Sequence, residues 1–306
     1  MSTEMQTRES SSLKDNMNSQ DKTELNHSDH ELNGDLSITA LYTAGVWYWA
    51  GFEYAELVTS IDSKRVFKVT NFALSIMRLF RWKLPKLAQG LAQRHSLIDQ
   101  LSQELPVKTI VELASGLSTR SFRHCHNHDL KQLEQYIEVD LPHVIKHKQE
   151  RLHQAGKLPP TLQFHAQDLK FFEAEKFKEQ FRLSDSLLVI AEGLVMYLKA
   201  EELKVLFLQI ATLLKTSQGR LVFDWLPSIE EPSPGFLGRT LGYLMKKFTG
   251  GNGFERDQRS RHDMIDLLYE LGAKNVELYD TKLIAKSRNL PFAQAHTQQL
   301  IFCADF

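Results

Sequence analysis

The sequence has few cysteines and no uninterrupted apolar segment. Its 306 residues include two cysteines, Cys125 and Cys303, too few for a disulfide framework, and a reducing compartment suits them. The N-terminus lacks the apolar segment of a secretory signal. Glu53 and Glu56 interrupt the most apolar stretch, Leu41 to Val58, so no charge-free span is long enough to cross a bilayer. We expect a cytoplasmic protein without stable membrane insertion.

An excess of charge of one sign is also lacking. The net charge is −1, the sequence pI is about 6.9, and charged residues make up 25% of the chain. This balance gives no general attraction for nucleic acid or for acidic lipid. Hydrophobic residues make up 42%, which is ordinary for a globular protein. We therefore expect no nucleic-acid partner.

The full G-x-G-x-x-G motif of dinucleotide sites is missing. An apolar run, Thr109 to Leu113, leads instead into Ala114-Ser115-Gly116, so that Ala114 replaces the first glycine. A second apolar run, Tyr136 to Val139, ends in Asp140, whose carboxylate can accept from both hydroxyls of a ribose. Small loop residues let a ligand approach the backbone closely. The pattern predicts a βαβ unit that holds a nucleotide but not a dinucleotide.

An acidic residue, Glu112, lies within the first of these strands. Buried parallel strands are normally apolar on both faces, and an unpaired charge there is costly. Two interpretations remain open at this stage. Glu112 is either a solvated strand residue, or a buried one whose charge is compensated by a cationic group of a ligand.

Repeated strand and helix segments predict the fold class. Apolar runs recur at helix-length intervals, which indicates an α/β protein with a doubly wound, mostly parallel sheet. Ligands then bind at the carboxyl ends of the strands. A row of carboxylates at those ends favours a ligand rich in hydroxyls, amines and positive charge. The residues expected there are Ala114 to Gly116, Asp140, Asp168, Glu192 and Asp224.

Four motifs in order, VELASGLSTRSF, YIEVDLPHVIKHKQERL, HAQDL and AEGLVMYL, resemble the leucine carboxyl methyltransferase family over roughly residues 37–306. The family includes bacterial S-adenosylmethionine-dependent O-methyltransferases. The resemblance implies a Rossmann-like seven-stranded sheet with an N-terminal helical lid. The last two strands of this sheet, expected at Asn275 to Thr281 and Gln298 to Ala304, would form an antiparallel edge. It implies S-adenosylmethionine as cofactor, whose ribose, amine, ammonium and sulfonium match the acidic row.

The resemblance also implies roles for individual residues. Arg94 would grip the methionyl carboxylate of the cofactor, although it could be a surface helix arginine. Asp168-Leu169 would lie at the adenine, although Asp168 could also cap the next helix. Glu192 would lie beside cofactor and substrate, and Glu192 to Val195 lacks the prolines of the Asn/Asp-Pro-Pro-aromatic tetrapeptide of amine methyltransferases. The predicted cofactor-binding residues are Arg94, Glu112, Ala114, Gly116, Asp140, Asp168, Leu169 and Glu192.

Composition divides the chain into a polar tail and one domain. Residues 1–35 contain no aromatic residue and are predicted to be disordered. The resemblance implies that residues 36–306 form a methyltransferase domain, with a helical lid over 36–105 and a Rossmann-like core over 106–306. Lys64 to Leu87 is either a basic amphipathic helix that lies on a membrane or a cover packed on the sheet, and its evenly spread aromatic residues favour a cover. Leu226 to Phe254, rich in Pro and Gly, is a predicted substrate loop.

Two polar segments are interpreted as solvated. Arg123 to Asp129 is rich in histidine, but we expect no metal. Lys146 to Arg151 is a charge run most simply explained as an exposed helix face.

The predicted function is S-adenosylmethionine-dependent methylation of a small-molecule hydroxyl or of a carboxylate. No catalytic base can be assigned, and Tyr197 is interpreted as a packing or orienting group. The methyl acceptor and the oligomeric state are left open. A nicotinamide-dependent oxidoreductase is one alternative, opposed by the missing glycines. A non-catalytic module with a degenerate pocket is another, because Ala114 replaces a glycine and Ser118 stands where relatives often carry Asp.

Overall fold

The computed structural model describes residues 36–79, 86–127, 132–156, 158–217, 219–225, 259–295 and 297–306. The predicted tail, residues 1–35, and the predicted substrate loop, Leu226 to Phe254, lie outside these described residues.

The described strands form one seven-stranded sheet in the order β3-β2-β1-β4-β5-β7-β6. The first five strands of this order are parallel, and β7 runs antiparallel to both of its neighbours. The predicted mostly parallel sheet with an antiparallel edge is therefore confirmed. The strands are β1 (Thr109–Leu113), β2 (Gln135–Asp140), β3 (Leu162–Ala166), β4 (Leu187–Ala191), β5 (Arg220–Trp225), β6 (Asn275–Asp280) and β7 (Leu300–Asp305).

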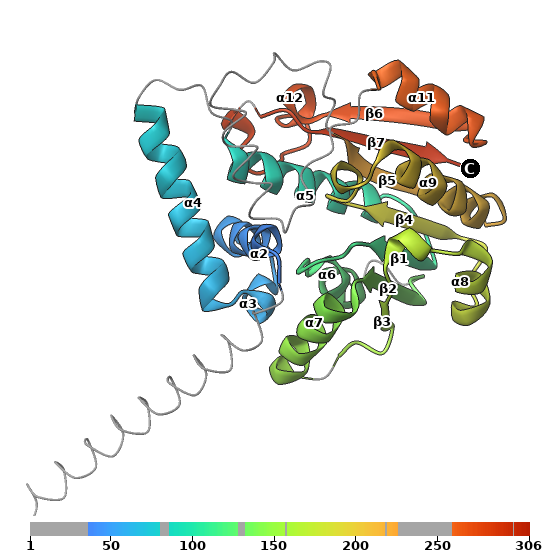
Figure 1. Ribbon diagram of the computed structural model, residues 1–306, viewed down its shortest axis with the longest axis horizontal. Helices are drawn as coiled ribbons and strands as arrows, with labels where there is room; N and C mark the ends of the chain where they lie inside the picture. The colour runs from blue at the N-terminus through green and yellow to red at the C-terminus, as the bar shows by residue number, and fades with distance from the viewer. Residues whose placement is uncertain are drawn as a thin grey trace, which may run out of the picture.

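Helices cover both faces of the sheet (Figure 1). On one face, side chains such as Val111 and Val189 pack with those of α8, α9 and α11. On the other face, Ile110 and Ile190 pack with α5, α6 and α7. Residues of both kinds alternate along each central strand, so β1 and β4 are buried over their full length. These helices are α5 (Leu87–Gln103), α6 (Arg120–His126), α7 (Pro142–Ala155), α8 (Ala174–Phe181), α9 (Ala200–Lys215) and α11 (Arg261–Glu270).

The segment before β1 contains helices of two kinds. α5 belongs to the core, where Leu97 and Ile98 are fully buried against the sheet. The helices that precede it lie beyond the carboxyl ends of the parallel strands (Figure 1). Ser37 caps the first of them by accepting from the amide of Ala40 at 3.1 Å. These helices are α2 (Ile38–Ala50), α3 (Ala55–Val58) and α4 (Ile61–Leu79).

The helix α4 packs along α2 at a glycine. A Cβ added at Gly45 would lie 2.6 Å from Cβ of Phe67 and 2.7 Å from the carbonyl oxygen of Ser63, so no larger residue fits this crossing. The interpretation of Lys64 to Leu87 as a cover packed on the sheet is wrong for its described part in α4, because α4 packs mainly on α2. In the described part of the chain, every helix is too short or too polar to traverse a bilayer. Cys125 and Cys303 are free thiols.

Candidate functional site

The site is built where the winding of the sheet reverses. β1 lies between β2 and β4. The segment after β1 leads to β2 on one side of β1, and the segment after β3 leads to β4 on the other side. Loops that follow β1 and β4 therefore diverge and leave a crevice at the carboxyl ends of these strands. The predicted residues Ala114, Gly116 and Glu192 belong to these two loops.

The loop after β1 turns through two left-handed residues. Ala114 has φ of 53° and Gly116 has φ of 51°. Ala114 thus adopts the conformation that a glycine would hold without strain, which explains how the incomplete glycine motif still forms the loop. The amide of Gly116 donates to Oδ2 of Asp140 at 2.7 Å. This bond fastens the loop to the tip of β2.

Asp140 contacts two backbone amides and remains at the edge of the crevice. Its Oδ1 accepts from the amide of Leu141 at 2.7 Å. Leu141 precedes α7 as its cap residue and Pro142 occupies the first turn, so Asp140 does not cap α7 itself. Burial raises its pKa, opposed by the two amides. Each carboxylate oxygen keeps a second lone pair that a ribose hydroxyl can use.

Asp168 lies at the next strand tip. It caps the short 3-10 helix Leu169–Phe171 by accepting from the amide of Lys170 at 2.9 Å, which confirms its capping role. The amide of Gln167 donates to the carbonyl of Asp140 at 2.8 Å, so the two acidic tips are neighbours. Asp168 is half-buried and Leu169 is buried. The structure thereby brings Asp140, Asp168 and the apolar side chain of Leu169 to one edge of the crevice.

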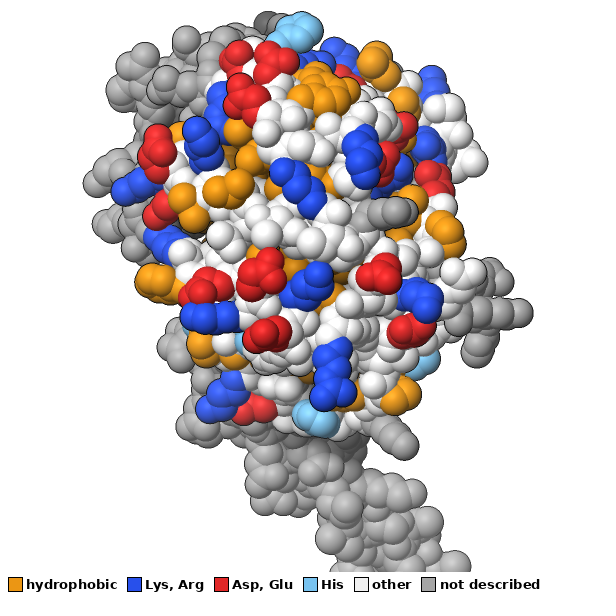
Figure 2. Space-filling model, turned by 90° about the vertical axis from the view of Figure 1, so that its right-hand side faces the viewer, with side chains coloured by type: hydrophobic (Ala, Val, Ile, Leu, Met, Phe, Trp, Pro, Cys, Tyr) orange, Lys and Arg blue, Asp and Glu red, His pale blue; other side chains and the backbone are white. Residues whose placement is uncertain are grey.

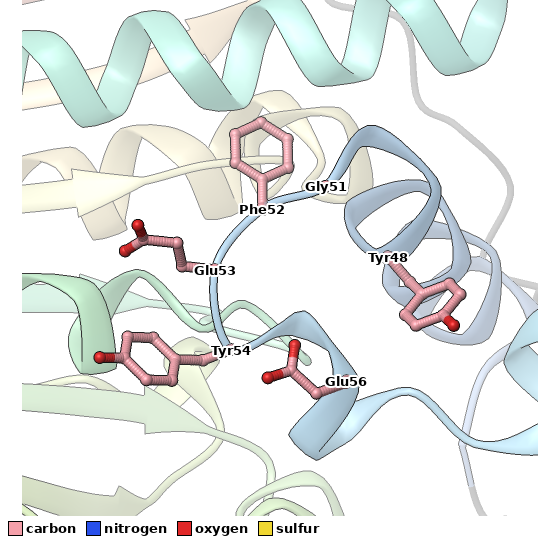
Figure 3. A pocket seen from close by; sticks show the side chains of 6 residues that line it. All are labelled: Tyr48, Gly51, Phe52, Glu53, Tyr54 and Glu56. Carbon is pink, nitrogen blue, oxygen red and sulfur yellow. The ribbon is translucent and has the colours of Figure 1, made fainter.

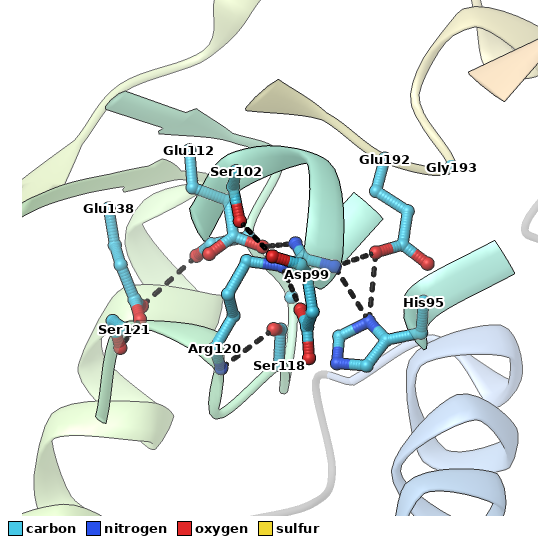
Figure 4. A network of polar contacts seen from close by, with 12 residues as sticks. His95, Asp99, Ser102, Glu112, Ser118, Arg120, Ser121, Glu138, Glu192 and Gly193 are labelled. Atoms are coloured by element: carbon cyan, nitrogen blue, oxygen red, sulfur yellow. Dashed lines mark hydrogen bonds and ion pairs between the residues drawn. The ribbon is translucent and has the colours of Figure 1, made fainter. Parts of the chain in front are cut away.

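A buried polar network lies below this edge, and Arg120 is at its centre (Figure 4). The Arg120 guanidinium donates Nε to Asp99 at 2.6 Å, Nη1 to Glu112 at 2.5 Å and Nη2 to Glu192. The side chain has no exposed surface. Our sequence interpretation did not select Arg120. The sequence feature that could have identified Arg120 is its position directly after the loop from Gly116 to Thr119, as the first residue of α6.

Glu112 is a buried strand residue with both oxygens bound inside the protein. It is 2% exposed, and besides Arg120 it accepts from the hydroxyl of Tyr136 at 2.6 Å. The interpretation of Glu112 as a solvated residue is therefore wrong. The compensating cation is Arg120 of the chain itself, so the burial of Glu112 requires no positive charge from a ligand.

Arg94 joins the tips of β4 and β5. Its Nε donates to Glu192 at 2.9 Å and its Nη1 to Asp224 at 2.8 Å, and it is 5% exposed. The alternative of a surface arginine is therefore wrong. The amide of Gly193 donates to Asp224 at 2.5 Å, which aligns the loop after β4 with β5. Arg94 is thus at the predicted edge, but two of its nitrogens already bind carboxylates of the protein.

The charges of these carboxylates are set by their neighbours. Burial alone would raise the pKa of Glu192, but His95, Arg120 and Arg94 outweigh it and hold that pKa well below the usual range. For Asp224, burial outweighs the guanidinium of Arg94 and the pKa is raised. Burial also lowers the pKa of His95, whose Nδ1 lies 2.9 Å from Glu192. Glu192 is therefore a firmly ionised group enclosed by donors.

A second buried pair supports the loop after β1. Nζ of Lys148 on α7 lies 2.5 Å from Oε2 of Glu138 on β2, and neither side chain is exposed. Ser115 of the loop donates to the same carboxylate at 3.2 Å. The interpretation of Lys146 to Arg151 as a wholly solvated face is wrong at Lys148, because this position faces the sheet and not water.

The interpretation of Arg123 to Asp129 as a solvated segment is wrong at His124, which lies on α6 and is 1% exposed. Two histidines of α6 contact the backbone. Nδ1 of His124 lies 2.9 Å from the carbonyl of Arg120, and Nδ1 of His126 lies 2.8 Å from that of Phe122. Among the described residues, no group of three potential ligands is arranged around a metal position. His128 and Asp129 lie outside the described residues.

A solvent-open cavity of about 530 Å³ lies at the turn between α2 and α3 (Figure 3). The turn is fastened to the start of α6, because Thr119 donates its hydroxyl to the carbonyl of Glu53 at 3.0 Å. The ring of Phe52 packs edge-on against His95, with centroids 4.8 Å apart. The cavity thus adjoins the network that holds Glu192. Its lining residues are Tyr48, Gly51, Phe52, Glu53, Tyr54 and Glu56.

The strand tips carry side chains that suit a nucleoside. A Cβ added at Gly116 would meet no atom nearer than the carbonyl oxygen of Ala114, at 4.0 Å, so the loop has free space beside it. Asp140 and Asp168 are acceptors at neighbouring tips, and Leu169 supplies an apolar surface. Tyr197, on the 3-10 helix after β4, hydrogen-bonds Thr39 of α2 and so holds α2 over this edge. The residues present therefore fit a bound S-adenosylmethionine.

One family of known proteins matches the sequence of this chain. The sequence profile of the leucine carboxyl methyltransferase family matches residues 52–211, just over half of the chain. The fold and the site define an S-adenosylmethionine-dependent methyltransferase with a Rossmann-like sheet. The chain belongs to the leucine carboxyl methyltransferase family. Membership sets aside the alternative of a nicotinamide-dependent oxidoreductase. No curated protein matches the chain significantly in sequence.

Solved structures resemble the chain in fold at low identity. A DUF574 family protein from Streptomyces avermitilis is 11% identical, with 90% of this chain and 99% of that chain covered and a TM-score of 0.55. A proposed methyltransferase from Thermobifida fusca is 12% identical, with 90% and 97% covered and a TM-score of 0.53. A proposed O-methyltransferase from Nostoc punctiforme is 15% identical, with 71% of this chain but only 57% of that chain covered and a TM-score of 0.46.

Proposed function

We propose that the enzyme transfers the methyl group of S-adenosylmethionine to an oxygen atom, either a small-molecule hydroxyl or a carboxylate. The observation that carries this proposal is the state of Glu192. One of its oxygens accepts from Arg94, and the other lies against Arg120 and His95. A carboxylate enclosed in this way is a poor acceptor for an incoming amine. The Glu192 to Val195 loop also lacks the prolines of the tetrapeptide that amine methyltransferases carry.

The cofactor contacts are proposed as follows. Asp140 accepts from the ribose hydroxyls, Asp168 with Leu169 contacts the adenine, and the loop from Ala114 to Gly116 approaches the ligand through its backbone. The methionyl end faces Arg94 and Glu192, and Glu112 supports this group through Arg120. The bound cofactor supplies an electrophilic methyl group on its sulfonium. The task of the chain is then mainly to align an acceptor oxygen with that methyl group.

The cavity at the α2–α3 turn supports an acceptor with an aromatic part. Tyr48, Phe52 and Tyr54 give it apolar walls, while Glu53 and Glu56 add two exposed carboxylates. Like charges repel, so the two glutamates disfavour an anionic acceptor beside them. Within the oxygen acceptors we therefore favour a hydroxyl over a carboxylate.

The division into a helical lid over residues 36–105 and a core over residues 106–306 is part of this proposal. So is the cytoplasmic location. The helices α2 and α3 lie at the strand tips, as a lid requires, whereas α5 packs in the core (Figure 1).

Labelled methyl transfer tests the proposal. The protein is incubated with small-molecule extracts and S-adenosylmethionine that carries a carbon-13 methyl group. The chemical shift of the transferred methyl carbon separates attachment to oxygen from attachment to nitrogen. Mild alkali then releases methanol from an ester but leaves an ether intact. We expect an alkali-stable O-methyl product. A methyl group on nitrogen contradicts the proposal, and an alkali-labile product contradicts the preference for a hydroxyl.

A further inference from the structure

The outer face of α4 carries an apolar ridge. Val69, Phe72, Ile76 and Leu79 are spaced three and four residues apart, so they lie along one side of the helix over about 15 Å. They are 68%, 68%, 40% and 82% exposed. The inner side of the same helix is covered, because Phe67 packs against α2 and Leu74 is buried. We call these four exposed residues the α4 ridge.

Basic residues continue this face toward the start of the helix. Arg65 and Lys68 are exposed on the same side, and the side chain of Arg65 is 70% exposed although it lies 3.4 Å from Asp62. The chain has no Asp or Glu from Ser63 to Ile98. Because the whole protein has a net charge of −1, this excess of positive charge is local. The basic residues of this stretch are Lys64, Arg65, Lys68, Arg78, Arg81, Lys83, Lys86 and Arg94.

The described surface on the side opposite α4 lacks a similar apolar ridge next to a basic segment. Figure 2 shows the side formed by α8, α9 and α11, where basic and acidic side chains are interspersed and apolar side chains are scattered. Single exposed apolar residues such as Val205 on α9, 57% exposed, are ordinary for a soluble surface. The α4 ridge differs because four such residues adjoin an acid-free, basic segment.

These charges decide between the partners that an apolar ridge could take. Two copies of α4 packed face to face would join two basic segments that contain no acidic residue from Ser63 to Ile98, which is unfavourable. The partner must be apolar and anionic together. The helix lies at the outside of the molecule (Figure 1), so it suits a deformable surface that admits side chains without a preformed groove. The interface of a bilayer with anionic lipids has these properties.

We propose that α4 docks the enzyme on an anionic membrane surface, with the α4 ridge inserted among the acyl chains and with Arg65 and Lys68 at the lipid headgroups. The sequence left two interpretations of this segment, a cover packed on the sheet and a membrane-surface helix. One side of α4 packs on α2 instead of the sheet, and the other side is free for lipid. The cofactor site at the strand tips takes no part in this contact.

Vesicle flotation of the full chain tests the proposal. We expect binding to vesicles of phosphatidylcholine with phosphatidylserine and little binding to vesicles of phosphatidylcholine alone. The double variant Phe72→Glu with Ile76→Glu should weaken binding about tenfold or more, because both inserted side chains are lost. Lys68→Glu should weaken it roughly fivefold or more and lower its salt dependence. Val205→Glu on α9 is the matched control and should bind as the wild type does.

Several outcomes overturn the proposal. One is equal binding to neutral and anionic vesicles, and another is no binding to either. A third is unchanged binding by both α4 variants, which should fold because they alter exposed positions. If the wild type is a dimer in light scattering and the ridge variants are monomers that still bind vesicles, the α4 ridge contacts a second copy instead. If only an acidic protein binds the ridge, vesicle flotation fails and the membrane is excluded.

Discussion

Arg120 is the residue whose removal should cost the fold most. Three carboxylates, those of Asp99, Glu112 and Glu192, surround its guanidinium, and the group is completely buried. Replacement would leave buried anions without their partner. A lysine would keep the charge but could not span three carboxylates, because it is a point donor and not a planar fork.

We therefore expect Arg120→Lys to lower the free energy of unfolding by about 3–5 kcal/mol. Urea denaturation at neutral pH measures it. The matched control is Arg288→Gln, since Arg288 pairs with Glu104 where both side chains are partly exposed. That change should cost less than about 1 kcal/mol. A loss no larger for Arg120→Lys than for the control contradicts the central place of Arg120 in the network.

His124 makes stability depend on pH. Burial first, then Arg120 and Arg123, lower its pKa to about 4 from 6.5. In the unfolded chain it binds a proton below pH 6.5, but in the folded protein only below about 4. The unfolded state thus holds more protons between these values, and stability falls as the pH falls through this window.

The slope from one such group is about 1.4 kcal/mol per pH unit, on the order of 3 kcal/mol over the window. His124→Gln cannot titrate and should flatten the dependence measured by urea denaturation from pH 6.5 to pH 4. Part of the pH dependence should remain in this variant, because the pKa of His95 is also lowered. The lowered pKa of Glu192 affects the stability only when the pH falls below the ordinary carboxyl range, about pH 4. An identical pH profile in the variant would show that His124 is not the group responsible.

At the scale of elements, the loop after β1 holds a residue in an unfavourable conformation. Ala114 has φ of 53°, which costs a residue with a Cβ about 1–2 kcal/mol. Glycine would remove that strain but would add about 0.5–1 kcal/mol of entropy loss on folding. Ala114→Gly should therefore raise stability slightly, by up to about 1 kcal/mol, and leave binding of S-adenosylhomocysteine intact.

Gly116→Ala should change the stability in the opposite direction and lower it. Its φ of 51° strains an alanine, although a Cβ would have space there. We expect a loss of about 1 kcal/mol. Differential scanning calorimetry of both variants compares the two shifts in melting temperature. If Ala114→Gly is clearly the more destabilising change, the strain at Ala114 has been misjudged.

The strand tips could be predicted from the sequence, but their pairing could not. Apolar runs that end in Asp140, Asp168 and Glu192 place these residues at one edge, because parallel strands share that edge. Which cation compensates Glu112 depends on how α6 packs under the sheet, and no local pattern encodes this. For the same reason Lys148 appeared to belong to a solvated charge run, since a single helix position that faces the sheet leaves little mark on composition.

At the scale of the whole molecule, two groups of carboxylates differ in role. One group is proposed to contact the cofactor at the strand tips, and the other forms ion pairs within the protein only. Asp140 belongs to the first group. Asp305 belongs to the second, because its carboxylate accepts from Nε of Arg220 at 2.5 Å where β5 begins, at the opposite edge. Both are carboxylates that accept from more than one donor of the protein. Only their place in the fold predicts a different effect on ligand binding.

The most direct test is calorimetric titration of S-adenosylhomocysteine into the wild type, Asp140→Asn and Asp305→Asn. We predict one binding site in the wild type. Asp140→Asn should bind about 10- to 150-fold more weakly, because charge-assisted bonds worth roughly 1.5–3 kcal/mol are lost. Asp305→Asn should bind as the wild type does. Absence of binding by the wild type, or unchanged affinity in a folded Asp140→Asn variant, would contradict the assignment of the cofactor site to this edge.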